Sequence, residues 1–100
     1  MELTYLVTLS KVASKHRDEL VRQGYGNKVE SILKTISKNP FPPNSKPLKG
    51  QAKGLYSVRV NIQDRIVFEI EPYDGDKYEG IINIISMRTH YKGIIPLFTL

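Results

Sequence analysis

Two stretches near the N-terminus carry the spacing of amphipathic helices. In the first, apolar positions recur about every 3.6 residues, and either His16 or Arg17 fills one of the intervals. Ser10 can cap the start of this helix, and Gly24 and Gly26 end it. Because charged residues surround His16, we expect its side chain to lie at the surface. The apolar positions are Leu9, Ala13, Leu20 and Val21.

The second helical pattern lies between residues 27 and 38. Its apolar residues are spaced i, i+3, i+4 and i+7, which is typical of one buried helix face. Asn27 followed by Glu30 resembles a capping box and predicts the helix start. Four prolines occur between residues 40 and 47, and they end the helix because proline lacks a backbone donor and restricts the preceding residue. The apolar residues are Val29, Ile32, Leu33 and Ile36.

The rest of the chain has the pattern of β-strands. Residues 3–9 are rich in Thr, Tyr, Val and Leu and predict a first strand. Apolar and polar residues alternate in residues 56–62 and 65–71, so each of these strands has one apolar face. Pro72 and the pair Asp74 and Gly75 mark a turn. An apolar run then begins at Ile81 and predicts a last strand that ends near Tyr91.

The apolar faces of the two central strands predict how they pair. A two-residue turn at residues 63–64 would place Ile62 opposite Arg65 and would mix apolar with polar faces. Pairing Asn61 with Arg65 instead puts the apolar side chains of both strands on one side, with a loop of residues 62–64 or longer. The polar side chains then project together from the opposite face: Ser57, Arg59, Asn61, Arg65 and Glu69.

The order of these elements, β-α-α-β-β-β, predicts a small α+β protein. We expect residues 1–100 to form a single domain, with an antiparallel sheet and two helices packed on one of its faces. The other face would be open and would carry the polar residues. No repeat, heptad pattern or low-complexity segment interrupts this organisation.

Composition narrows the classes of function. The net charge is +5 and the pI is near 9.5, and a basic surface attracts phosphate backbones by releasing counterions. Charge alone fits a merely soluble basic protein equally well. The absence of cysteine excludes disulfides and thiolate chemistry, and fits a reducing compartment. With neither a bilayer-spanning run nor a signal peptide pattern, the sequence predicts a cytoplasmic protein.

Reactive side chains gather where the last predicted strand ends. Arg88, His90 and Tyr91 occur within four positions, and two of them, Arg88 and His90, would face the same way on a regular strand. Neither a metal site nor a cofactor is predicted, since cysteines, further nearby histidines and nucleotide-binding motifs are lacking. A metal-free set of Arg, Lys, His and Tyr suits RNA cleavage by the RNA's own 2′-hydroxyl. Solvated charges at a strand terminus explain the same residues at least as well.

A resemblance to a known protein family favours RNA cleavage over solvated surface charges as the explanation of these residues. The segments "NPF", "KPLKG", "GLYSVRVNIQDRIVFEI" and "MRTHY" resemble, in order and spacing, the RelE/YoeB toxins of bacterial toxin–antitoxin pairs, and especially the Txe/YoeB branch. The resemblance covers about residues 39–92. It implies a ribosome-dependent endoribonuclease that cuts mRNA in the ribosomal A site and is inhibited by a cognate antitoxin. It also implies partners that include the ribosome and mRNA, and a homodimer or a hetero-oligomer with the antitoxin.

The resemblance also implies roles for particular residues. Arg65 corresponds to the arginine that stabilises the phosphorane, and His90 and Tyr91 correspond to the terminal pair for acid–base chemistry and base stacking. Arg59 corresponds to an arginine near the scissile phosphate, and Lys49 to the basic loop that meets ribosomal RNA. We expect the remaining cations of these segments, Lys53 and Arg88, to bind RNA as well.

The chain departs from the family pattern at the position of the general base. Related toxins carry a glutamate there, whereas this chain has Asn44, Ser45 and Lys46. Candidate replacements are Lys46 or Lys49, with Glu69 as a further carboxylate on the predicted face of Arg65. In addition, Val58 replaces the first arginine of a pair and Asp64 replaces a histidine. A catalytically inactive homologue that only binds its antitoxin, or acts in an autorepressor complex, is therefore the alternative.

Overall fold

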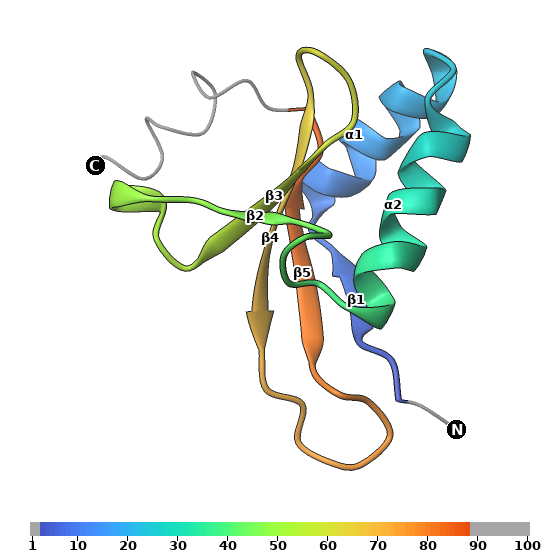
Figure 1. The fold of residues 1–100 in the computed structure, drawn as a ribbon. Helices are drawn as coiled ribbons and strands as arrows, with labels where there is room; N and C mark the ends of the chain where they lie inside the picture. Colours follow the sequence, from blue (N-terminus) through green and yellow to red (C-terminus); the bar gives the residue numbers. More distant parts are fainter. Residues whose placement is uncertain (1–2, 89–100) are drawn as a thin grey trace.

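The computed structural model describes residues 3–88, which form a five-stranded sheet with two helices on one of its faces (Figure 1). The helices are α1 (Lys11–Arg22) and α2 (Gly26–Lys38), and a short 3₁₀ helix, η1, spans Gly50–Ala52. The strands are β1 (Leu6–Leu9), β2 (Lys46–Pro47), β3 (Leu55–Arg59), β4 (Arg65–Glu71) and β5 (Ile81–Ser86). Their order in the sheet is β1-β5-β4-β3-β2. Within the described residues, neither helix is long and apolar enough to cross a bilayer.

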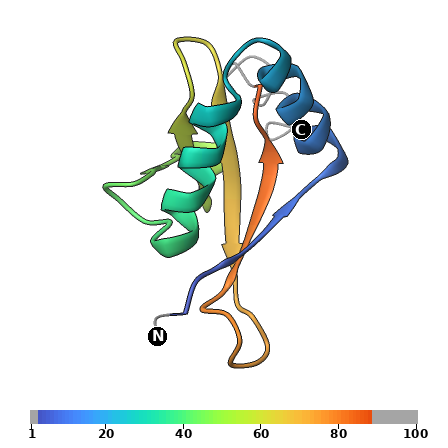
Figure 2. The same ribbon diagram turned by 90° about the vertical axis from the view of Figure 1, so that its right-hand side faces the viewer.

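The predicted α+β fold is confirmed, with one change in strand direction. The sheet is antiparallel except at β1, which runs parallel to β5 and pairs Leu6 with Ile81 and Leu9 with Ile84. Figure 2 shows β1 next to β5, uncovered by either helix in this view. The wholly antiparallel sheet was wrong because the sequence pattern of β1 does not encode which strand it joins. The first strand is also shorter than residues 3–9, and two-residue β2 was not predicted.

The ends of the helices follow the sequence signals in part. Ser10 caps α1 as predicted, because its Oγ accepts a hydrogen bond of 3.0 Å from the backbone N–H of Ala13. The predicted capping box of α2 is wrong. That helix begins at Gly26, one residue before Asn27, and its cap residue Tyr25 makes no side-chain hydrogen bond. Glu30 instead forms an ion pair with Arg17 of α1, which joins the two helices.

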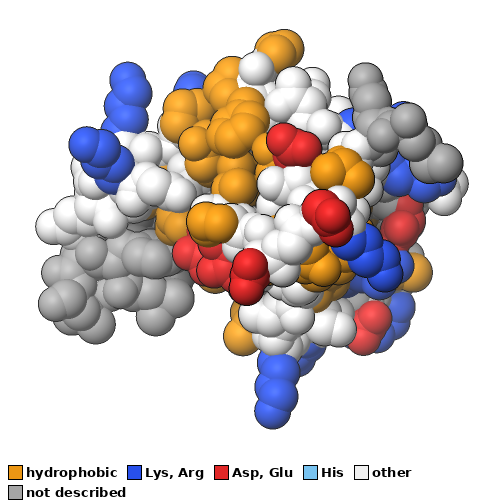
Figure 3. Space-filling model, turned by 90° about the horizontal axis from the view of Figure 1, so that it is seen from below, with side chains coloured by type: hydrophobic (Ala, Val, Ile, Leu, Met, Phe, Trp, Pro, Cys, Tyr) orange, Lys and Arg blue, Asp and Glu red, His pale blue; other side chains and the backbone are white. Residues whose placement is uncertain are grey.

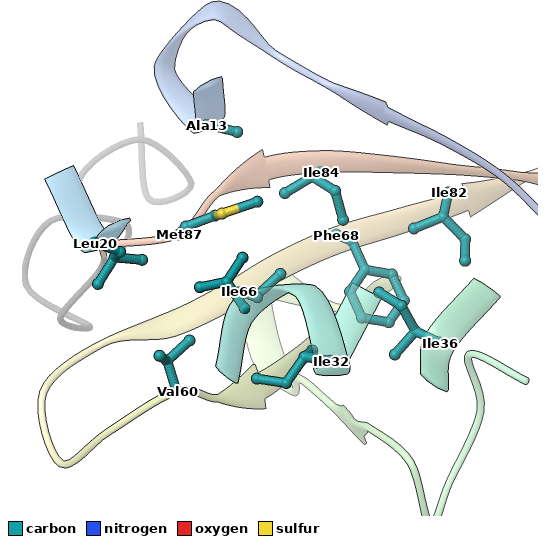
Figure 4. Packing of buried hydrophobic residues seen from close by; sticks show 11 residues of the cluster. Ala13, Leu20, Ile32, Ile36, Val60, Ile66, Phe68, Ile82, Ile84 and Met87 are labelled. Carbon is teal, nitrogen blue, oxygen red and sulfur yellow. The ribbon is translucent and has the colours of Figure 1, made fainter. Parts of the chain in front are cut away.

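The main core lies between the helices and the sheet. Phe68 of β4 is fully buried, and Figure 4 shows side chains of α1, α2, β4 and β5 gathered between the helices and the sheet. Val60, Ile66 and Phe68 belong to the apolar halves of the two predicted alternations, so the predicted apolar faces of these strands are confirmed. The buried cluster comprises Ala13, Leu20, Val29, Ile32, Ile36, Val60, Ile66, Phe68, Ile82, Ile84 and Met87.

The register of the β3–β4 hairpin differs from the prediction by two residues. Arg59, and not Asn61, lies opposite Arg65, so the loop spans residues 60–64. A two-residue shift keeps every side chain on its predicted face, so the apolar pattern cannot detect it. Asn61 sets the longer loop, because its Oδ1 accepts hydrogen bonds of 2.8 Å from the backbone N–H groups of Gln63 and Asp64.

The face of the sheet opposite the helices is less open than predicted. The segment that contains β2 and η1 extends away from the helices and folds over this face (Figure 1). Leu48 anchors it, packing with Leu55 and Val67 in a second small buried cluster. Gly50 has a φ of +68°, a conformation that favours glycine, so the tight turn after Lys49 depends on it.

The last strand ends earlier than predicted. β5 stops at Ser86, and the backbone N–H groups of Met87 and Arg88 donate to Nδ1 of His16, at 3.1 Å each. Because these donors bond to a helix side chain, they do not continue a strand ladder. Residues 89–91 of the predicted strand lie outside the described residues.

Candidate functional site

Three of the predicted cationic residues come together in one groove. Arg65, Lys46 and Lys49 line a hollow of about 310 Å³ together with Pro47 and Leu48. We call these five residues the cationic groove. Among the described residues that line it, none carries a carboxylate. The groove therefore presents positive charge without a negative side chain in its lining.

Local structure explains why these side chains meet. Lys46 pairs with Ser57 and Pro47 with Tyr56, so β2 lies against the edge of β3. The backbone N–H of Leu48 then donates to the carbonyl of Leu55 at 2.9 Å, and the Leu48 side chain is buried below it. This docking of the loop through Leu48 delivers the two lysines to the side of the sheet on which Arg65 begins β4.

Arg59 adds a further cation to this face. It ends β3 directly opposite Arg65, so two arginines are cross-strand neighbours. Like charges in that position destabilise a sheet. The Arg59 side chain is exposed, and its Nη1 donates a long hydrogen bond of 3.4 Å to the carbonyl of Ile62. Two neighbouring arginines of this kind would attract an anion to the space between them.

The other candidates lie apart from the groove. Glu69 shares a strand face with Arg65 but lies four residues along β4, about 13 Å away by strand geometry, with Leu55 and Asn83 as its cross-strand neighbours. Lys53 follows η1 and lines an adjacent hollow that also includes Lys49. Of the candidate general bases, Lys46 and Lys49 therefore lie close to Arg65, whereas Glu69 does not.

Arg88 lies in a different charge environment from the one predicted. Its Nη1 is 3.6 Å from Oε1 of Glu19, and its Nε is 3.7 Å from Oδ1 of Asp64. It lines a separate hollow with residues of the β3–β4 loop and the α1–α2 turn, and no residue of that hollow lines the cationic groove. We call His16, Glu19, Asp64 and Arg88 the strand-exit cluster. Arg88 is thus paired with two carboxylates beside the end of β5.

His16 is the residue whose place the sequence analysis misjudged. Its imidazole is partly buried and accepts two hydrogen bonds from the end of β5, so the expected surface role is wrong. Burial is the main cause that lowers the pKa of His16 below its usual value, and the nearby Arg88 lowers it further. The signal was present in the helical periodicity, in which His16 fills the interval between the buried Ala13 and Leu20.

Two candidates cannot be placed. His90 and Tyr91 lie outside the described residues, so their predicted roles stay predictions. Within residues 3–88, no three His, Asp or Glu side chains are grouped closely enough to hold a metal ion.

Charge on the remaining surface is distributed differently. The β4–β5 loop, residues 72–80, carries Asp74, Asp76 and Glu79 against Lys77. Figure 3 views the end of the molecule at which this loop lies, and there acidic and hydrophobic side chains are intermixed while Lys and Arg lie mostly toward the margins. The basic character of the protein is therefore not uniform, and the cationic groove is a local concentration of it.

Comparison with known proteins identifies the family. Residues 15–91 match the family of YoeB-like toxins of bacterial type II toxin–antitoxin systems. A curated relative, Toxin YoeB of Synechocystis sp., is 33% identical over 67 residues, which cover 65% of this chain and 70% of the relative.

Solved structures share the fold. A YoeB/ParE toxin from Agrobacterium tumefaciens superposes with a TM-score of 0.71 at 20% identity, covering 86% of this chain and 99% of that one. The YoeB dimer from Staphylococcus aureus has a TM-score of 0.66 at 25% identity, covering 87% of this chain and 98% of that one. The YoeB–YefM complex from the same organism gives 0.64 with the same coverage. The chain belongs to the family of YoeB-like toxins of bacterial type II toxin–antitoxin systems.

Proposed function

We propose that this toxin is a metal-independent endoribonuclease that cleaves mRNA in the A site of the ribosome. The observation that carries the proposal is the cationic groove, in which Arg65, Lys46 and Lys49 share one lining without a carboxylate. A phosphate that gains negative charge during cleavage needs cations held in place before the reaction. Arg59, opposite Arg65, extends the same charge along the path of an RNA backbone.

The proposed reaction is attack by the 2′-oxygen on the adjacent phosphorus. The P–O bond to the 5′-oxygen breaks, which leaves a 2′,3′-cyclic phosphate and a 5′-hydroxyl end. The proton of the 2′-hydroxyl passes to a base, and the departing 5′-oxygen takes a proton from an acid. Arg65 stabilises the phosphorane, and His90 is the acid. Lys46 is the favoured base, a role that requires its neutral amine, while its neighbour Lys49 supplies positive charge. Tyr91 stacks on a base of the mRNA, as aromatic rings commonly do with unpaired bases.

The partners follow from the same family. The S. aureus relative that forms the YoeB–YefM complex covers most of this chain, and this supports a cognate antitoxin that binds and inhibits the toxin. The YoeB dimer from that organism likewise supports self-association as one state of the free protein. The ribosome supplies the substrate position, and Lys49, Lys53 and Arg59 are the side chains proposed to contact RNA.

A second candidate function rests on the missing glutamate. No carboxylate lines the cationic groove, and Glu69 lies about 13 Å along the strand from Arg65. A protein that keeps the cations but lacks a competent base would bind RNA and antitoxin without cleaving. In that case the chain would act in a complex with its antitoxin and would not arrest growth.

Cleavage of a labelled mRNA on programmed ribosomes tests both candidates. The wild type should produce cleaved ends that carry a 2′,3′-cyclic phosphate. If Lys46 is the base, Lys46→Gln should slow single-turnover cleavage by about 10²-fold or more, because a general base contributes at least that much. Lys53→Gln is the matched control, since it removes the same charge outside the cationic groove and should mainly weaken binding. A wild-type rate for Lys46→Gln would exclude it as the base, and an inactive wild type would favour the second candidate.

A further inference from the structure

Helix α1 is fastened to the end of β5 at two places. At its start, the Ser10 hydroxyl donates to the carbonyl of Ile85 at 2.8 Å. Almost two turns later, Nδ1 of His16 accepts the backbone N–H groups of Met87 and Arg88. The second attachment lies immediately before the segment that leads to His90 and Tyr91 in the sequence. In it, the N–H groups of Met87 and Arg88 bond to His16 and not to the backbone of a neighbouring strand.

Charged groups reinforce the second attachment. The guanidinium of Arg88 lies between Glu19, on the same helix as His16, and Asp64, in the β3–β4 loop. Asp64 is only 5% exposed and accepts a hydrogen bond of 3.0 Å from Nδ2 of Asn61. Arg88, two residues after the end of β5, is therefore held through its main chain by α1 and through its side chain by both α1 and the β3–β4 loop.

We propose that His16 is a positioning residue. Together with Arg88, Asp64 and Glu19, it fixes the direction in which the chain leaves β5 at Met87 and Arg88, the point from which the sequence continues to His90 and Tyr91. This inference rests on the proposed function. Arg88 then acts through its pairing with carboxylates and not as an RNA-binding cation.

The geometry requires a particular protonation state. Nδ1 can accept two N–H groups only when it carries no proton, so the neutral imidazole has its proton on Nε2. The charged groups facing His16 are Lys15 and Glu19 on α1, Asp64 in the β3–β4 loop and Arg88 after β5. Burial and the two cations lower the pKa of His16, while the carboxylates oppose this shift. The acceptor therefore persists at neutral pH and is lost under acidic conditions.

Two substitutions of His16 distinguish the effect of its hydrogen-bond acceptor from the effect of its imidazole ring. His16→Ala removes the acceptor, whereas Asn in His16→Asn has an oxygen near the position of Nδ1, has similar helix propensity and does not titrate. In His16→Ala, the amides of Met87 and Arg88 should exchange about tenfold faster, as expected for lost hydrogen bonds. The kcat for mRNA cleavage should fall by about 10²-fold with little change in KM, because the reactive residues are misplaced. His16→Asn should recover most of both losses. Asp18→Ala, an exposed change on the same helix, should alter neither.

The pH dependence has a definite sign. The unfolded chain takes up a proton at the ordinary histidine pKa of about 6.5, whereas folded His16 resists it until a lower pH. The free energy of unfolding and the protection of the Met87 and Arg88 amides should both fall as the pH drops through this interval. In His16→Asn the protection of these amides should stay constant over the same interval.

The outcomes separate this inference from the proposed function. An unchanged protection of the Met87 and Arg88 amides in His16→Ala overturns the inference, and so does a loss of protection that leaves kcat at the wild-type value. Failure of His16→Asn to restore protection would also contradict it. If the wild type itself does not cleave mRNA, the proposed function is wrong, and the positioning role in catalysis fails with it.

Discussion

Arg65 and Arg88 lie at the same end of neighbouring strands, yet the side chains described around them differ in charge. Arg65 begins β4 and lines the cationic groove with two lysines, and a second arginine, Arg59, lies directly opposite it. Arg88 follows β5 and has carboxylate oxygens at 3.6 and 3.7 Å from Glu19 and Asp64. The sequence analysis predicted that both arginines act on RNA from the basic sheet. The structure shows that Arg65 lines the cationic groove, whereas Arg88 is paired with carboxylates.

The difference shows which cations are available to a ligand. Cations grouped together add to one another's positive potential, and that potential attracts an anionic ligand to the groove. A cation between two carboxylates contributes to the folded state, and an anionic ligand would have to compete with those carboxylates. We therefore expect changes in the cationic groove to affect function more than stability. We expect changes in the strand-exit cluster to affect stability first.

The largest effect should come from Arg65→Ala. If Arg65 stabilises charge gained at the transition state, its removal should raise the barrier by about 3–4 kcal/mol, by analogy with the loss of an oxyanion-hole donor. Arg65→Lys should recover only part of this, because the planar pair of donors is lost. Single-turnover cleavage on programmed ribosomes measures the barrier, and urea unfolding should show a change of no more than about 1 kcal/mol. Cleavage at the wild-type rate would remove Arg65 from the mechanism.

A smaller effect, of the opposite kind, is expected for Asp64→Asn. Asp64 is buried beside Arg88, so its neutralisation should lower the free energy of unfolding by about 1–2 kcal/mol at pH 7. Glu19→Gln is the matched control, because its side chain is 31% exposed and solvent screens its pairing with Arg88. It should cost clearly less in urea unfolding. Equal losses in the two variants would show that the buried pairing of Asp64 is not what balances Arg88.

The sequence predicted the regular parts of the fold because burial imposes a repeating pattern on them. The stripe of α2 and the alternation in β4 each place apolar residues in the main core, and the structure confirms both. Such patterns specify which face of a helix or strand is buried. They do not specify which strands pair with each other or in which register. For that reason the parallel pairing of β1 and the two-residue shift between β3 and β4 were missed. The shift depends on three hydrogen bonds of the Asn61 side chain within its own loop.

The same reasoning explains which site residues could be predicted. Charge clustering and the family motifs led to Arg65, Lys46 and Lys49, and the structure brings these three into one groove. It also separates Glu69, which strand alternation alone placed on the same face. The periodicity could have predicted that His16 is partly buried, but not its hydrogen-bond partners, because these bonds join positions 71 and 72 residues apart in the chain. Contacts of that range depend on how the helix is docked.

The smallest effect is expected for Arg59→Gln, which tests the cross-strand pair of arginines. This change removes one of two like charges that face each other across β3 and β4, so at low salt it should stabilise the fold by about 0.2–1 kcal/mol. The gain should shrink as salt is added, because exposed charges are screened. Affinity for ribosomes or RNA should fall nonetheless, and the slope of log K against log salt should decrease by about one unit if Arg59 contacts one phosphate. Urea unfolding and binding titrations over a range of salt concentrations measure the two quantities. A variant that is less stable than the wild type at low salt would mean that the charge of Arg59 is already balanced in the free protein, and the contrast between the two regions would then not hold for this residue.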